Sequence, residues 1–333
     1  MRVDVRPEMF RWARERARLS EEVLARRIPK LEAWERGDVR PTLKQIETFA
    51  KATHTPVGYL FLARRAEHLD ALRRTRAVQH AAGLAESRDV APAEIARLNP
   101  HVSLDGVIGG TFCPTDGFIK PMGLLTGYLD AARRLGVRVA FGANVADLSN
   151  VRARWIVNAA GAWAGAFGVA VTPLRRQVLP TVGAGALSPD DPMTIWVDDG
   201  FHFRLRDGRA LLLWPGGAAP ADPFDTSVDP AWMDRVESIA RERVPGLAGV
   251  AVDRAGAWAG LYEMSPDGHA ILGRMDRVVL VNGSSGHGVM HAPALGQLAA
   301  EIILDGRAHT LDVSPLRPSR FAEGCPVRGV ELL

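Results

Sequence analysis

The residues with the clearest capacity for chemistry form a glycine-rich turn near the carboxyl-terminal end of the sequence. Val278–Val281 predicts a buried strand, which leads into Gly283–Gly288 and then a predicted helix. Such a turn leaves backbone N–H groups unpaired at the start of the helix, where they bind anionic groups. Its small residues allow close approach of a planar ring or a phosphate. Taken alone, this pattern is more often an ordinary connection between a strand and a helix.

The elements that must position this turn are those of a mixed α/β protein. Trp155–Val157 predicts a second buried strand, and Ala159–Gly161 follows it as another turn that permits backbone contact with a cofactor. The other predicted elements are helices over 66–82 and 121–134, a short strand over 137–140, and a hairpin formed by 201–205 and 210–213.

Four segments, in order along the chain, resemble FAD-dependent amine oxidoreductases of the D-amino acid/sarcosine oxidase superfamily. They are Pro114–Pro121, Trp155–Phe167, Tyr262–Gly273 and Val281–Ile303. The resemblance covers residues 58–306, about three quarters of the chain. It implies an α/β (α+β) fold with a mixed-sheet substrate domain, and FAD bound non-covalently.

The resemblance also implies an activity and a set of site residues. Hydride would pass from a C–H next to an amine onto FAD, and water would hydrolyse the resulting imine. Arg204 is the candidate cation for a substrate carboxylate, with Tyr262 and His287 lining the pocket; a structural role for Arg204 or His287 stays open. Met290 stands where sarcosine-oxidase relatives often carry a Lys, which argues against a sarcosine-type carboxylate clamp. The implied cofactor-binding residues are Val145, Ala159, Ala160, Gly161, Trp163, Gly283, Ser284, Ser285, Gly286, His287, Gly288 and Val289.

One part of the family pattern is missing. The family begins with a strand, a GxGxxG turn and a helix that hold the FAD diphosphate, and this fingerprint is absent from the sequence. Its loss removes a central strand of a parallel sheet, so we expect an incomplete FAD-dependent oxidoreductase fold with an unpaired sheet edge. A homodimer, or a partner chain that completes the nucleotide-binding domain, would cover that edge. Whether the chain alone retains FAD, and whether it is active, stays open.

Residues 1–62 read as a separate all-α module, followed by the oxidoreductase-like domain over 63–333. They hold 13 Lys+Arg against 9 Asp+Glu, whereas the remainder is nearly neutral. This module resembles an Xre-type helix-turn-helix domain. The residues that match the pattern of that domain are Leu24-Ala25, Trp34-Glu35, Gly37, Arg40–Leu43 and Leu60. About four residues are missing between Ala25 and Trp34, where the recognition helix would lie, which favours contacts to the DNA backbone. The candidate DNA-binding residues are Arg26, Arg27, Lys30 and Arg36.

Composition excludes several classes of protein. The 333 residues are 47% hydrophobic and 24% charged, without a run of eighteen apolar residues, so we predict no membrane span. The charged start of the sequence and its two cysteines predict a cytoplasmic protein without a disulfide scaffold, and we predict no metal site. Three functions stay open: a flavin-dependent oxidoreductase acting on a small amine or amino acid, a DNA-binding or antitoxin-like regulator whose large domain binds a ligand or partner, and an inactive fusion product.

Overall fold

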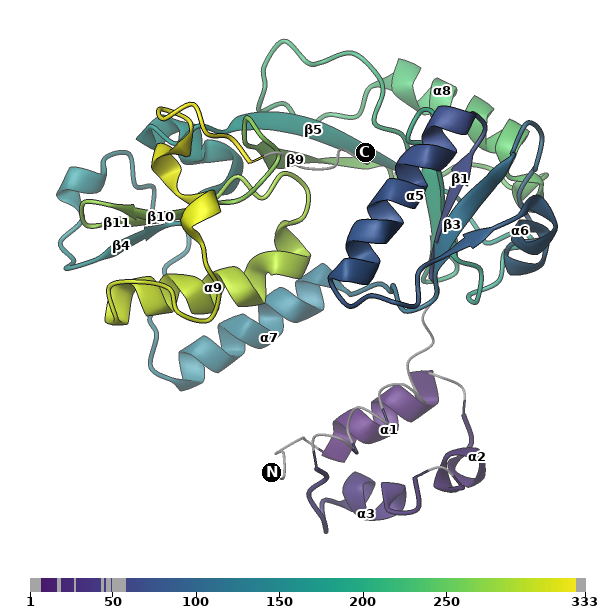
Figure 1. Cartoon of the computed structure of the whole chain (residues 1–333), viewed down its shortest axis with the longest axis horizontal. Helices are drawn as coiled ribbons and strands as arrows, with labels where there is room; N and C mark the ends of the chain where they lie inside the picture. Colours follow the sequence, from purple (N-terminus) through teal and green to yellow (C-terminus); the bar gives the residue numbers. More distant parts are fainter. Residues whose placement is uncertain are drawn as a thin grey trace.

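The computed structural model describes residues 7–16, 19–26, 28–42, 45, 49 and 58–327. They form an amino-terminal group of helices, a large mixed sheet and a small sheet (Figure 1). The helices are α1 (Pro7–Arg16), α2 (Glu21–Ala25), α3 (Leu31–Arg36), α5 (Ala66–Ala81), α6 (Pro92–Leu98), α7 (Pro121–Arg134), α8 (Pro230–Arg243) and α9 (Gly288–Leu304). The strands are β1 (Tyr59–Ala63), β2 (Arg88–Val90), β3 (Gly109–Cys113), β4 (Ile156–Asn158), β5 (Thr172–Pro180), β6 (Met193–Trp196), β7 (His202–Arg206), β8 (Arg209–Leu213), β9 (Trp258–Met264), β10 (Ile271–Met275) and β11 (Val278–Asn282). Within this part of the chain, no helix is both long and apolar enough to cross a membrane.

The large sheet has eight strands in the order β2-β3-β1-β6-β7-β8-β5-β9. β1 and β6 are parallel and the other neighbours are antiparallel, so the mixed sheet expected from the sequence is confirmed, as is the hairpin of β7 and β8. The sheet begins at Tyr59, so the unit boundary expected at residue 62 falls inside β1. The physical reason is burial, because Leu60 and Leu62 are fully buried in the core of this sheet.

The core lies on one face of the large sheet. Trp196, Phe203 and Leu212 point from the strands toward Trp232 and Val236 of α8, and all five are almost fully buried. α5 packs against β1 and β3 (Figure 1). The face opposite α8 therefore carries the alternate residues of β5, β7 and β9.

The small sheet has the strand order β10-β11-β4. β10 and β11 are antiparallel, β11 and β4 are parallel, and α9 covers one face through Leu295, Leu298 and Ile302. Among the described residues, β4 has a hydrogen-bonded neighbour on one edge alone, namely β11. An open edge of a parallel sheet is unusual because such sheets are normally buried, and the expected unpaired edge is present here.

The helix expected over 121–134 forms as α7, but it has no buried residue. Met122, Leu125 and Tyr128 are all more than half exposed. The strand expected over 137–140 does not form. Its alternating apolar residues Val137 and Val139 are exposed and pair with no strand among the described residues.

The amino-terminal helices pack around their own aromatic cluster. The rings of Phe10 and Trp34 are 5.5 Å apart and those of Phe10 and Phe49 are 5.1 Å apart. Gly37 ends α3 in the left-handed conformation with a φ of +82°. The buried Trp34 and the helix-ending Gly37 show that these helices pack together, but they do not show the helix-turn-helix domain expected over residues 1–62. Residues 43, 44, 46–48 and 50–57 of the expected all-α module lie outside the described residues.

Candidate active site

The turn between β11 and α9 has a shape that requires glycine. Gly283 and Gly286 have φ values of +68° and +88°. A Cβ atom on Gly286 would lie 2.6 Å from a ring carbon of Tyr262, so the turn packs directly on that ring. No side chain caps the first turn of α9, whose N–H groups stay available to an anionic ligand.

Hydrogen bonds hold this turn against the end of β9. The Ser285 amide donates to the Glu263 carbonyl at 3.2 Å, and the Ser265 amide donates to the Ser285 hydroxyl at 3.0 Å. The Ser284 amide donates to Glu263 Oε1 at 3.3 Å, whereas Glu263 Oε2 is buried without a partner among the described residues. These contacts join the small sheet to the last strand of the large one.

The face opposite α8 collects polar side chains from three strands. The register aligns His202 with Leu213, Leu213 with Val178, and Val178 with Trp258, and residues two apart on a strand share a face. We call this surface the arginine face, and its defining residues are Arg176, His202, Arg204 and Tyr262. The sequence-predicted Arg204 and Tyr262 therefore share one face with each other and with the glycine turn.

Arg204 is half-buried and forms no ion pair with a carboxylate of the described residues. Its guanidinium lies 4.9 Å from the centre of the Phe118 ring, and its Nε is buried without a hydrogen-bond partner among the described residues. Burial lowers the pKa of Arg204 and raises that of the nearby Tyr59. An arginine in this setting remains a cation that lacks a counter-charge.

Arg176 and His202 complete the arginine face. The Arg176 guanidinium lies 5.8 Å from the centre of the Tyr262 ring and donates to the Pro215 carbonyl at 3.4 Å. Burial lowers the pKa of Arg176. His202 donates from Nδ1 to the Gly200 carbonyl at 2.8 Å, and burial, with further effect from both arginines, lowers its pKa. His202 is therefore neutral near pH 7.

The second turn, after β4, also begins with a buried asparagine. Asn158 Oδ1 accepts a hydrogen bond from the Ala160 amide at 3.0 Å. Asn158 Nδ2 and Asn282 Oδ1 are buried without partners among the described residues. Both asparagines lie at the carboxyl ends of adjacent parallel strands, where ligands bind in such sheets. Unless a ligand or another polypeptide pairs with them, these atoms carry a desolvation cost.

A groove of about 490 Å³ runs along α9 beside the open edge of β4. Its walls are mostly apolar, and small residues of α9 recur at four-residue spacing. The lining residues are Val157, Ala159, Glu263, Val281, Ser284, Gly288, Ala292, Leu295, Gly296, Ala299, Ala300 and Ile303.

Other predicted cofactor residues are less enclosed. Trp163 and Val289 belong to the segments that follow the two turns, and both are exposed. Trp163 stacks on Phe224 with ring centres 5.8 Å apart. Val145 is exposed in the segment after α7. His287 stacks on His291 at 6.0 Å, in the first turn of α9.

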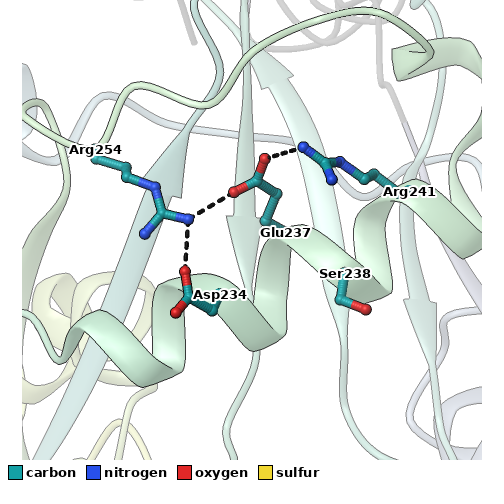
Figure 2. Close-up of a pocket in the computed structure, with 5 residues that line it drawn as sticks. All are labelled: Asp234, Glu237, Ser238, Arg241 and Arg254. Carbon is teal, nitrogen blue, oxygen red and sulfur yellow. Dashed lines mark hydrogen bonds and ion pairs between the residues drawn. The ribbon is translucent and has the colours of Figure 1, made fainter.

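A hollow of about 550 Å³ on α8 has a different character (Figure 2). Arg254 donates to Asp234 and Glu237 at 2.7 Å, and Arg241 pairs with Glu237 at 2.5 Å. Because each of its charged side chains is paired with another in the same hollow, we assign it a structural role.

The predicted DNA-binding residues are only partly described. Arg26 and Lys30 are exposed beside α2 and α3, and Arg27 lies outside the described residues. Arg36 pairs with Glu32 and Asp38. Its charge is therefore already engaged within the module.

Sequence reasoning missed Arg176, His202 and Glu263. Alternation along 201–205 could have placed His202 beside Arg204 on one face. Arg176 and Glu263 become visible only through the register between β5 and β9, which aligns Arg176 with Gly260, two residues before Tyr262.

Comparison with known proteins gives evidence on the family and fold of the chain. A family model described as FAD dependent oxidoreductase matches residues 7–302. The mouse (Mus musculus) FAD-dependent oxidoreductase domain-containing protein 1 is 30% identical over 197 residues, which cover 51% of this chain and 39% of that protein. Glycine oxidase of Bacillus subtilis is 25% identical over 232 residues, 64% of this chain and 61% of that protein. The chain thus spans less than two thirds of the length of these relatives.

Two solved structures share the fold. L-proline dehydrogenase from P. horikoshii superposes with a TM-score of 0.72 at 23% identity, covering 82% of this chain and 78% of that one. Glycine oxidase from Geobacillus kaustophilus gives a TM-score of 0.68 at 20% identity, covering 79% and 74%.

Proposed function

Because the chain belongs to the family of FAD dependent oxidoreductases, we propose that it oxidises a small amine or amino acid at a C–N bond. The observation that carries this proposal is the contact between Gly286 and Tyr262. This contact brings the Gly283–Gly288 turn, which resembles a flavin-binding turn, directly against the arginine face. FAD, when bound, supplies the hydride acceptor, and water hydrolyses the imine product to a carbonyl compound and an amine or ammonia.

The side chains of the arginine face give the substrate its orientation. Arg204 binds the substrate carboxylate, since its guanidinium has no anion among the described residues and its planar fork suits a carboxylate. Tyr262, packed on the turn, limits how deeply the substrate enters. Neutral His202 adds no positive charge, so a substrate amine meets less repulsion here than beside an imidazolium.

The residues present fit part of FAD. The backbone of Gly283–Gly288 and of Ala159–Gly161 would hold it, because both turns follow parallel strands and the first opens an uncapped helix. The unpaired atoms of Asn158 and Asn282 lie at the same strand ends. The sequence contains no GxGxxG turn between a strand and a helix that would hold the diphosphate.

A further polypeptide segment would complete the FAD site. The open edge of β4 accepts a strand, and the adjacent groove accepts a helix, which Ala292, Gly296 and Ala300 allow to approach closely. A strand followed by a helix would satisfy both at once and would cover exposed apolar residues such as Leu125 of α7. We therefore propose a partner chain with a strand–glycine turn–helix unit, and a homodimer as its competitor.

The first test is a visible absorption spectrum of the purified chain, with and without added FAD. A flavin band near one per chain that survives gel filtration supports binding by the residues present. Arg204→Met should then weaken amine turnover mainly through KM, by about tenfold or more. Arg209→Gln is the matched control, because Arg209 is an exposed arginine of β8 already paired with Asp253. A colourless chain that fails to retain FAD, alone and with lysate of its source, indicates an inactive fusion product.

DNA binding by the amino-terminal module stays a second proposal. Exposed Arg26 and Lys30 and a self-contained aromatic core are the observations that favour it. Salt-dependent binding to duplex DNA, reduced when both residues become Gln, would support it. Unchanged binding after that substitution would argue against it.

A further inference from the structure

The arginine face carries more positive charge than one substrate carboxylate requires. Arg176 and Arg204 approach it from β5 and β7, on opposite sides of β8. Tyr262, on β9, flanks Arg176, whose guanidinium lies 5.8 Å from the centre of its ring. His202 stands on β7, two residues before Arg204 and on the same face of the sheet.

Neighbouring arginines outside this pair have acidic partners. Arg175 pairs with Asp225, and Arg206 pairs with Asp207. Among the described residues, no carboxylate lies within ion-pair distance of Arg176 or Arg204. Half-buried guanidinium groups without counter-ions are costly in a protein interior unless a ligand supplies the missing charge.

We propose that Arg176 and Arg204 bind the two carboxylates of a dicarboxylate amine, one on each guanidinium, with the amine held between them beside Tyr262. This substrate class rests on the proposed function for the oxidation step, whereas binding to the two arginines does not. Two charge-assisted contacts make the site prefer a dicarboxylate to a monocarboxylate of the same amine type.

Isothermal titration of the full chain tests this preference directly. The probes are iminodiacetate, which has two carboxylates around a secondary amine, and N-methylglycine, which has one. We expect iminodiacetate to bind about 10- to 100-fold more tightly, the range of one additional charge-assisted contact. Arg176→Met should abolish this difference while changing the affinity for N-methylglycine by less than about twofold.

Controls separate loss of the contact from loss of the fold. Arg209→Met removes an exposed, paired arginine of β8 and should leave both affinities unchanged. Arg176→Lys retains the charge without the planar fork and should give an intermediate preference, with cooperative unfolding as in the unmodified chain. Equal affinities for the two probes, no binding of iminodiacetate at about 10 mM, or a preference that survives Arg176→Met would each overturn the proposal.

Failure of the oxidation proposal has a different signature. If the chain binds iminodiacetate more tightly than N-methylglycine but transfers no electrons to added FAD, the dicarboxylate site is supported and the proposed oxidation is not. If the chain oxidises N-methylglycine and iminodiacetate and binds both with equal affinity, the proposed activity is supported and the dicarboxylate site is not.

Discussion

The two sheets of this protein differ in how far they are closed. The large sheet has eight strands and a core in which Trp196 and Trp232 are almost fully buried. The small sheet ends at β4, whose outer edge is open among the described residues, beside a groove and an exposed α7. The difference shows that the sheet carrying the arginine face is covered by its own chain, whereas one strand edge of the small sheet is left open among the described residues.

The largest expected effect is in the closed sheet. Trp196→Ala should lower the free energy of unfolding by about 3–5 kcal/mol, because it removes a fully buried ring from the core. Val157→Ala in β4 should cost less than about 1 kcal/mol, since that side chain is half exposed. Urea titration measures both. Equal losses at the two positions would mean that β4 is as well covered as the large sheet.

The next effect tests whether the small sheet is open on every side. Arg320 is fully buried beside β10 and forms two 2.8 Å hydrogen bonds with the Asp267 carboxylate, which together with other bonds hold the pKa of Asp267 well below its usual range. Arg320→Met leaves that carboxylate buried and unpaired and should cost about 3 kcal/mol. Adding Asp267→Asn to this variant should recover part of the lost free energy of unfolding, because the buried charge is removed; urea unfolding measures both variants. If Arg320→Met lowers the free energy of unfolding by less than Val157→Ala does, the β10 side of the small sheet is also weakly packed.

A pH titration sharpens the comparison further. The Glu301 carboxylate, in the last turn of α9, accepts hydrogen bonds from the Thr310 hydroxyl and from the His309 and Thr310 amides, and these bonds lower the pKa of Glu301 to about 2. A lowered folded-state pKa gives stability that is present above the unfolded value and is lost as pH falls from about 4.5 toward 2. The melting temperature of Glu301→Gln, followed by circular dichroism, should therefore fall less over this range than that of the unmodified chain. A parallel fall in both would assign the acid sensitivity elsewhere.

The smallest expected effect on stability is on α7. Leu125→Ser with Tyr128→Ser should change the free energy of unfolding by no more than about 0.5 kcal/mol, because both side chains are exposed. The same pair should weaken self-association or capture of a partner, measured by analytical ultracentrifugation. A large loss of stability in the isolated chain would show that α7 is already covered.

Local patterns predicted much of this fold. The apolar runs that became β4 and β11, the hairpin of β7 and β8, and the α7 helix all follow from residue periodicity. The prediction of a strand over 137–140 was wrong, because alternation of apolar and polar residues does not by itself provide a neighbouring strand to pair with. The expected boundary at residue 62 lies within β1, whose Leu60 and Leu62 are buried against strands far along the chain, a contact that local patterns do not reveal.

The site was only partly accessible to such reasoning. Arg204 and Tyr262 stood in recognisable segments, and the structure places them on one face. Arg176 gave no signal in the sequence, because its position depends on the register of β5 with β9.

The three-residue length of β4 has a consequence for the chain as it is made. A strand with one free edge can pair with strands of other chains, and the exposed apolar side chains of α7 add a surface that favours aggregation. Its brevity limits how many intermolecular hydrogen bonds a wrong pairing can form. We therefore expect the chain to accumulate as soluble protein when a complementary polypeptide is synthesised in the same cell at matched dosage, and as aggregates when it is made in excess.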